Sequence, residues 1–290
     1  MSSVRQFRKK IKSAKNIAKL TRAMQFVAAS KMKKAQEQAA GGKDYVNGLI
    51  SLSYLLSNYL DPKLHPLLQS GSEEGKVIIV LVAPEKGLCG SLVTNLSKKL
   101  ILAVEAIGKQ RIEFITVGKK ANQVIRRIGG EIIAEFTLGL SSPKYETVPP
   151  IANLIEERFR DGLASRVVFI FSEFVNTLNQ VPTERTLLPL KPTYDDTREE
   201  PNNKDYLFEP SAKEVVEPFL EMYLEVEIYQ ILQESYAAEQ SARMVAMKNA
   251  TDNAQSLIGD LSLEYNKVRQ SIITAEILDI GNAVGMLSNA

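Results

Sequence analysis

The sequence of 290 residues has little of several residue types: one cysteine, one histidine and no tryptophan. The single cysteine, Cys89, excludes a disulfide within the chain and an internal dithiol switch. One cysteine and one histidine are too few for a metal site of the common nitrogen and sulfur type, so we expect no metal and no cofactor. His65 lies in a proline-flanked turn and is predicted to be a surface residue, not a catalytic base.

Long apolar runs are also missing. No run of about 18 apolar residues occurs, and the basic N-terminal stretch is not followed by an apolar segment with a small-residue cleavage site. We therefore expect neither a membrane-spanning helix nor a signal peptide, and a soluble protein on the cytosolic side. Proline is absent from residues 4–59 and from everything after Pro218.

The two proline-free segments predict two long helices. Near the C-terminus apolar residues recur every three or four positions, first at Leu257, Leu261, Tyr265, Val268 and Ile272, then in a shifted phase at Ile273, Ile277, Ile280, Val284 and Leu287. The N-terminal segment has a similar stripe at Phe7, Ile11, Ala14, Ala18, Met24, Val27 and Ala28. Isolated helices of this length need packing along their sides.

The two predicted helices carry opposite net charges, which favours pairing between them. Residues 1–43 carry twelve Lys or Arg against one Glu, whereas residues 211–290 carry twelve Asp or Glu against five Lys or Arg. We predict an antiparallel coiled coil of an N-terminal helix in residues 1–60 and a C-terminal helix in residues 211–290.

Residues 61–210 alternate between strand and helix patterns. Lys76–Ala83 is a continuous apolar run of the kind found in strands that are buried on both faces. This pattern predicts an inserted α/β domain with a Rossmann-like, mostly parallel sheet. The predicted strands are 76–83, 111–117, 131–136 and 166–171, the helices are 92–108, 119–128 and 148–160, and segments 178–189 and 206–208 are candidates for a final hairpin.

Nucleotide-binding fingerprints are missing from this α/β region. Residues 71–77 have too few residues between their glycines for a phosphate loop, and no G-x-G-x-x-G follows a strand. The strongest enzyme-like feature is the turn 87–91, which presents Cys89 near a helix start, where its pKa would fall. No base accompanies it, and a tight strand-to-helix turn explains its glycines equally well.

Several motifs resemble the γ subunit of F-type ATP synthases. They are IKSAKNIAKLTRAMQFVAASKM near the start, KGLCG after the first strand, AEQSARMVAMKNATDNA and YNKVRQSIITAE. The resemblance covers the whole chain in order. It implies a non-catalytic rotor subunit, with no nucleotide chemistry of its own. In such a subunit the terminal helices would turn inside a ring of α and β subunits and the sheet domain would rest on the c-ring; the ε subunit would be a further partner.

The resemblance also implies contact residues. Polar contacts to β-subunit loops would come from Arg243, Arg269, Gln270, Thr274 and Glu276, with Met24 opposite them. The segment D-Y-L-F-E-P, with Tyr206, Phe208 and Glu209, would be the foot on the c-ring. For Met24 the alternative is ordinary coiled-coil packing. The implied location is the cytoplasmic face of a bacterial plasma membrane, peripheral through the complex, with a proton-driven ring or, alternatively, a sodium-driven one.

Two other function classes remain open at this point. The basic N-terminal helix is compatible with a nucleic-acid-binding coiled coil, although no reading motif accompanies it, and the resemblance implies no nucleic acid partner. The turn at Cys89 is compatible with a cysteine-dependent α/β enzyme. DNA retention by the chain would favour the first alternative, and a turnover that Cys89→Ser abolishes would favour the second.

Overall fold

The computed structural model describes residues 2–57, 65–72, 74–139, 141–190, 209 and 212–288. The chain divides into two units, which are described separately. Residues 1–27 and 244–290 form the helix-pair unit, and residues 28–243 form the sheet unit. In the described part of the chain, no helix combines the length and the apolar character needed to cross a membrane.

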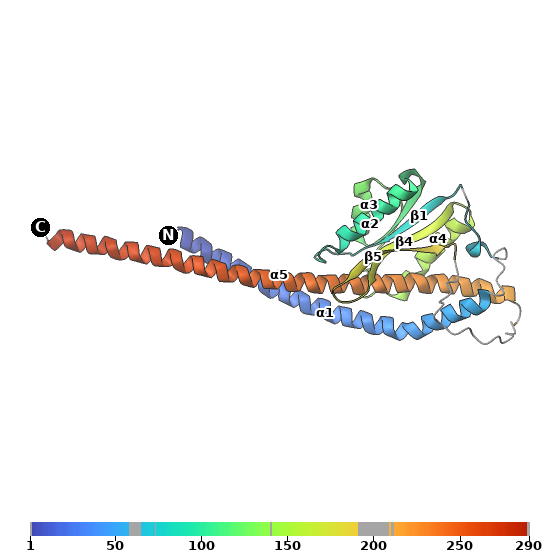
Figure 1. The fold of residues 1–290 in the computed structure, drawn as a ribbon, viewed down its shortest axis with the longest axis horizontal. Helices are drawn as coiled ribbons and strands as arrows, with labels where there is room; N and C mark the ends of the chain where they lie inside the picture. Colours follow the sequence, from blue (N-terminus) through green and yellow to red (C-terminus); the bar gives the residue numbers. More distant parts are fainter. Residues whose placement is uncertain are drawn as a thin grey trace. The chain divides into compact units, whose positions relative to one another are not determined.

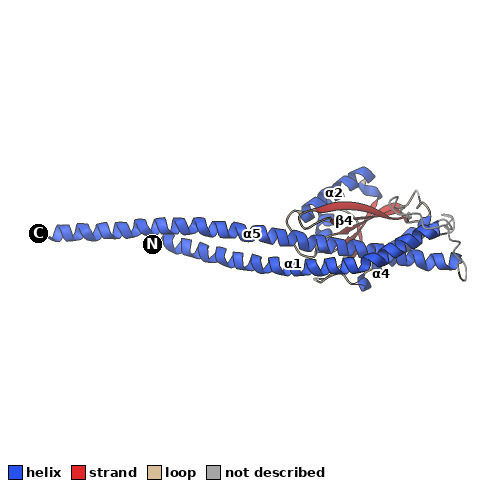
Figure 2. Ribbon diagram, turned by 60° about the horizontal axis from the view of Figure 1, so that its bottom comes forward, coloured by secondary structure: helices blue, strands red, loops and turns tan. Residues whose placement is uncertain are grey.

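The helix-pair unit consists of the ends of two long helices, α1 (Ser2–Ser57) and α5 (Ala212–Ser288). Arg8 lies opposite Tyr265, and its guanidinium donates a hydrogen bond of 3.2 Å to the tyrosine hydroxyl. Further along α1, the hydroxyl oxygens of Thr21 and Thr251 are 2.7 Å apart. Moving forward along α1 therefore means moving backward along α5, which confirms the predicted antiparallel coiled coil. Both chain ends belong to this unit (Figure 2).

Small side chains line the contact between the two helices. Ala14 and Thr21 of α1 are 4% and 8% exposed, and Thr251 and Ala254 of α5 are 5% and 8% exposed. Each pair is separated by seven or three residues, the spacing of a coiled-coil seam. Small residues allow the two backbones to approach closely, so this part of the pair is thin.

The predicted apolar seam of α5 is shorter than the sequence pattern indicates. Ile273, Ile277 and Ile280 are 41%, 63% and 65% exposed. Because α1 begins at Ser2 and Arg8 lies opposite Tyr265, no described part of α1 lies beside α5 beyond about Ile272. Within the paired region, Leu257 and Val27 were also predicted to pack, but they are 50% and 57% exposed, because they lie off the three- and four-residue stripe that the buried residues follow.

The sheet unit is built on five strands in the order β3-β2-β1-β4-β5. Their bounds are β1 Lys76–Val82, β2 Ile112–Val117, β3 Ile132–Phe136, β4 Ala164–Phe174 and β5 Gln180–Leu188. The first four are parallel and β5 is antiparallel to β4. The predicted Rossmann-like, mostly parallel sheet is therefore confirmed.

Helices cover both faces of this sheet (Figure 1). One face packs on α2 (Leu92–Ile107) and α3 (Lys119–Ile128), which bury apolar residues against Val77, Ile79 and Leu81. The other face packs on α4 (Pro149–Arg160) and on the part of α5 from Val216 to Leu232. The alternation along β1 explains this division, because successive side chains of a strand point to opposite faces.

Two details differ from the sequence prediction, the pairing of residues 180–188 and the burial of His65. Residues 180–188 form β5 by pairing with β4. The proposed hairpin segment 206–208 and the predicted domain boundaries at 60/61 and 210/211 lie outside the described residues. His65 is not a surface residue: it is 5% exposed, and its Nδ1 accepts a hydrogen bond from the Leu67 N–H at the start of a short 3-10 helix. Burial and the neighbouring Arg160 lower the pKa of His65.

Candidate functional site

The sheet order reverses at β1, whose two neighbours are β2 and β4. In open α/β sheets, ligands bind outside the carboxyl ends of the strands at such a switch point. In this chain two loops border it: the loop 83–91 between β1 and α2, which we call the β1 loop, and the turn 175–179 between β4 and β5.

Helix α5 contacts both of these loops. The Arg243 guanidinium donates hydrogen bonds to the carbonyl oxygens of Lys86, at 3.1 Å, and Gly87, at 3.3 Å. The Ser241 hydroxyl donates to the carbonyl oxygen of Thr177 at 2.7 Å. In nucleotide-binding proteins with this type of sheet, a dinucleotide binds beside these loops. In this chain helix α5 contacts the loops instead. This agrees with the missing phosphate-binding fingerprint.

Arg243 is held in place by a carboxylate one helical turn earlier. Its guanidinium lies 2.7 Å from Glu239 Oε1, and the two side chains are only 12% and 16% exposed. Burial raises the pKa of Glu239, and the positive charge of Arg243 opposes that shift. Pairing with Arg243 favours the ionised form of Glu239, and the pair holds the guanidinium facing the β1 loop.

The β1 loop is strained where Arg243 holds it. Leu88 has a φ of 64°, in the left-handed region that a leucine rarely adopts, and its side chain is 62% exposed. Two hydrogen bonds to the preceding carbonyls help to fix this conformation.

The prediction of a lowered thiol pKa for Cys89 is wrong. Cys89 is 2% exposed and packs in the apolar cluster between the sheet and α2, so burial raises its pKa. A buried, protonated thiol is a poor nucleophile, which disfavours the cysteine-dependent enzyme. Among the described residues no group of His, Cys, Asp and Glu is arranged to hold a metal ion.

The other predicted contact residues are distributed over both units. In the helix-pair unit, Met24 is half-buried on α1, and the α5 residues Arg269, Gln270, Thr274 and Glu276 are exposed. The Thr274 hydroxyl donates to the Gln270 carbonyl oxygen at 2.9 Å. In the foot segment only Glu209 is described, and it is exposed; Tyr206 and Phe208 lie outside the described residues.

Sequence reasoning missed two residues of this site, Glu239 and Ser241. Both belong to the AEQSAR motif, in which only Arg243 was singled out. Glu239 is four residues before Arg243, the spacing of an ion pair on one helix face, so that pair was readable from the sequence. The contact of Ser241 with Thr177 was not, because it joins residues that are distant in the chain.

Comparison with known proteins gives a consistent result. The family model described as ATP synthase matches residues 3–286. The ATP synthase gamma chain of Nitrosococcus oceani is 40% identical over 283 residues, which cover 97% of this chain and 98% of the relative. That of Dehalococcoides mccartyi (strain CBDB1) is 39% identical over 292 residues, covering 99% of this chain and all of the relative.

Two solved structures share the fold. A chain of the Euglena gracilis mitochondrial ATP synthase, in a structure of OSCP, F1 and the c-ring, matches with a TM-score of 0.66 at 17% identity, over 98% of this chain and 95% of its own. A chain of the Tetrahymena thermophila enzyme, in a structure of the central stalk and c-ring, matches with a TM-score of 0.60 at 23% identity, over 80% and 99%. Together with the sequence matches, these findings show that the chain belongs to the family of ATP synthase gamma chains.

Proposed function

We propose that this chain is the central rotor shaft of a proton-translocating F-type ATP synthase. In this role it couples rotation of a membrane c-ring to ATP synthesis or hydrolysis at sites on β subunits. The family match supports the assignment, and the similar chain of the Tetrahymena thermophila enzyme comes from a structure of the central stalk and c-ring. The chain itself takes no part in nucleotide chemistry, which occurs in its partners.

One observation carries this proposal: the unpaired continuation of α5. Beyond Ile272, the exposed side chains include Ile273, Ile277, Leu278 and Ile280. Water-exposed apolar residues gathered on one helix end mark a contact surface. An apolar end makes few directional bonds, so it can turn within an apolar sleeve of α and β subunits. Polar contacts with β subunits would come from residues just before and within this stretch, namely Arg269, Gln270, Thr274 and Glu276.

The remaining partners follow from the same role. The sheet unit would rest on the c-ring through the foot segment and would bind the ε subunit. The chain would then lie at the cytoplasmic face of a bacterial plasma membrane, peripheral through the complex. Nucleic acid binding by the basic end of α1 has no support in the family match, and the buried thiol of Cys89 argues against a cysteine-dependent enzyme.

Single charges on α1 should matter little to coupling. Lys33 lies 3.8 Å from Glu37, and the two side chains are 78% and 64% exposed. Exposed ion pairs of this kind contribute about 0.5 kcal/mol or less and are screened by salt. We expect Lys33→Ala to leave ATP-driven proton pumping in vesicles unchanged at physiological salt. A clear loss of pumping would instead identify Lys33 as a specific partner contact.

Replacing Tyr206 and Glu209 with alanine tests the proposed foot. We expect the double variant to weaken attachment of the catalytic head to membranes, while the released head keeps its ATP hydrolysis. The measurement is the share of hydrolytic activity that stays with washed membranes, together with proton pumping. Glu105→Ala, which removes an exposed carboxylate from α2, is the matched control and should retain both. Normal attachment and pumping in the double variant would refute the foot.

A further inference from the structure

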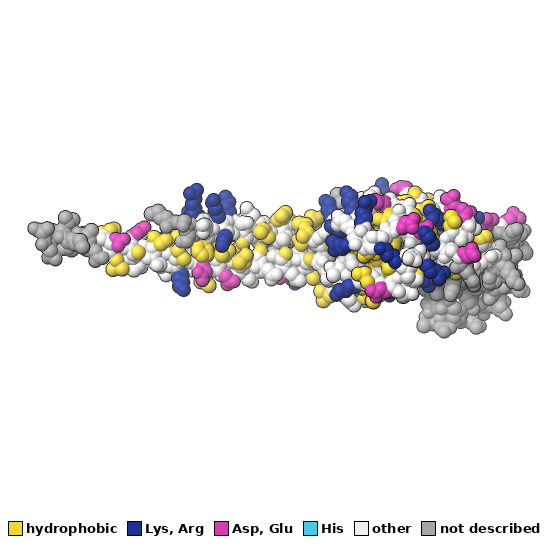
Figure 3. All heavy atoms as spheres, turned by 90° about the horizontal axis from the view of Figure 1, so that it is seen from above, with side chains coloured by type: hydrophobic (Ala, Val, Ile, Leu, Met, Phe, Trp, Pro, Cys, Tyr) yellow, Lys and Arg dark blue, Asp and Glu magenta, His cyan; other side chains and the backbone are white. Residues whose placement is uncertain are grey.

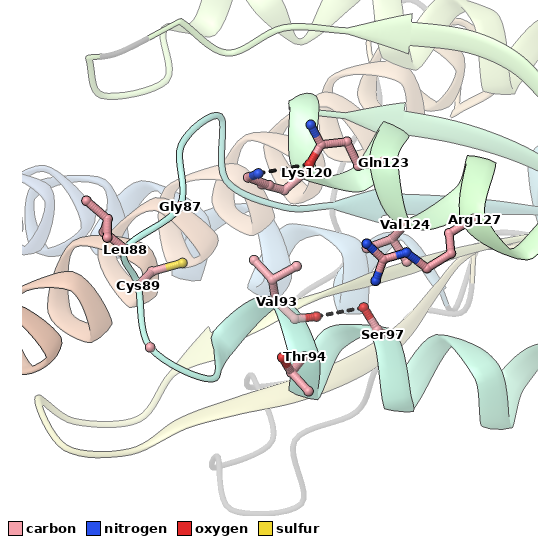
Figure 4. A pocket seen from close by; sticks show the side chains of 11 residues that line it. Gly87, Leu88, Cys89, Val93, Thr94, Ser97, Lys120, Gln123, Val124 and Arg127 are labelled. Carbon is pink, nitrogen blue, oxygen red and sulfur yellow. Dashed lines mark hydrogen bonds between the residues drawn. The ribbon is translucent and has the colours of Figure 1, made fainter.

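A cavity of about 330 Å³ opens between α2 and α3, beside the β1 loop (Figure 4). Val93, Thr94 and Ser97 line it from α2, and Lys120, Gln123 and Arg127 line it from α3. It lies where β1 and β2 end, on the carboxyl edge of the sheet, which is the edge that binds ligands in open α/β folds. This volume is at the small end of the range of small-molecule pockets, about 300–1,000 Å³.

The charge of the cavity has one sign. Lys120 and Arg127 are cationic, and none of the lining residues is Asp or Glu. The Lys120 ammonium group donates a hydrogen bond to the neutral Gln123 side chain, at 2.8 Å. In the described part of the chain, neither Lys120 nor Arg127 forms an ion pair, whereas the adjacent Arg126 is paired with Glu135 at 2.8 Å. Figure 3 views the sheet unit from the side of α2 and α3, where Lys and Arg side chains gather.

Neutral groups of the cavity complement these two cations. Thr94 and Gln123 offer a hydroxyl and an amide, and the N-cap residue Ser91 makes no side-chain capping bond to the first turn of α2. The positive end of the α2 dipole is therefore not offset by a cap. The thiol of Cys89 is 2% exposed and points into the cavity in Figure 4. Val93 and Val124 complete an apolar wall.

We propose that this cavity binds a small phosphate-bearing anion, held by Lys120 and Arg127. A guanidinium matches two phosphate oxygens at once, and an ammonium group supplies a third charge-assisted bond. The same cavity is lined by Gly87 and Leu88, so the bound anion would lie beside the loop to which Arg243 donates hydrogen bonds. The bound phosphate group belongs either to inorganic phosphate or to a nucleotide. Binding at this site does not depend on the rotor assignment.

Calorimetric titration of the full chain with inorganic phosphate, pyrophosphate and ADP, at constant ionic strength, tests the proposal. We expect saturable binding of at least one of them at one site. Lys120→Gln and Arg127→Gln should each weaken it about tenfold, since each removes a charge-assisted bond. Arg126→Gln is the matched control, because it removes a neighbouring charge that is already paired, and it should bind normally. Comparing the affinities of the three ligands distinguishes a phosphate site from a nucleotide site.

Thermal unfolding gives an independent measurement. A bound anion should raise the melting temperature of the parent chain and of Arg126→Gln, but not that of the Lys120→Gln/Arg127→Gln double variant. Three results would overturn the proposal: no saturable binding of any of the anions, equal weakening by Arg126→Gln, or binding that the double variant retains. Tighter binding of an acidic peptide than of any phosphate compound would also overturn it, by making the cavity a protein contact.

Discussion

Replacing Ala254 with proline is expected to uncouple ATP hydrolysis from proton pumping, or to prevent assembly of the complex. Ala254 is 8% exposed in the contact between α1 and α5, in the interior of a helix of 77 residues. Proline there removes a backbone hydrogen bond and clashes with the preceding turn, at a cost of about 3 kcal/mol or more. A shaft that is broken within its paired region cannot transmit torque to the end of α5.

The comparison variant is Gly259→Ala, five positions further along the same helix. A Cβ atom at Gly259 would meet nothing within 4 Å, so alanine fits and raises helix propensity by about 1 kcal/mol. This variant should pump at least as well as the parent. Both chains are assembled with their partner subunits and assayed for ATP hydrolysis and ATP-driven pumping in the same vesicles. Normal pumping by Ala254→Pro would show that α5 is not the element that transmits torque.

Local sequence patterns were sufficient for the fold. The strand at Lys76–Val82 is apolar on both faces, and α3 was predicted with its observed bounds, because glycines stand at both of its ends. Patterns failed where packing depends on the partner. Ile273, Ile277 and Ile280 continue the periodicity of α5, but periodicity cannot indicate where α1 begins relative to them.

The site was harder to predict than the fold, for the same reason. The buried thiol of Cys89 follows from an apolar cluster whose members come from three strands and three helices. The hydrogen bonds of Arg243 to Lys86 and Gly87 join residues more than 150 positions apart. The spacing of residues within one helix cannot predict such contacts. The family resemblance singled out Arg243, but it assigned the side chain to a partner subunit and not to the β1 loop.

Arg243→Ala is therefore expected to act first on the chain itself. It leaves Glu239, whose side chain is 16% exposed, without its cation and frees the carbonyl groups of the β1 loop. Breaking a buried ion pair in this way costs about 3 to 5 kcal/mol, and we expect the lower end because both side chains retain some exposure. Thermal unfolding of the chain should show the loss, and coupling in assembled complexes should fall with it.

The pH dependence and a second variant separate this mechanism from a direct partner contact. Burial raises the pKa of Glu239, so its ionised form destabilises the folded chain above its unfolded pKa, and that penalty falls as the pH is lowered. Without Arg243 the penalty is larger. Arg243→Ala should thus regain stability between neutral and acidic pH, and Glu239→Gln should restore it at neutral pH in the double variant. Restored stability with restored coupling would show that Arg243 acts within the chain, by compensating the buried charge of Glu239. If stability returns while coupling stays lost, Arg243 must also contact a partner directly, as the family resemblance implied.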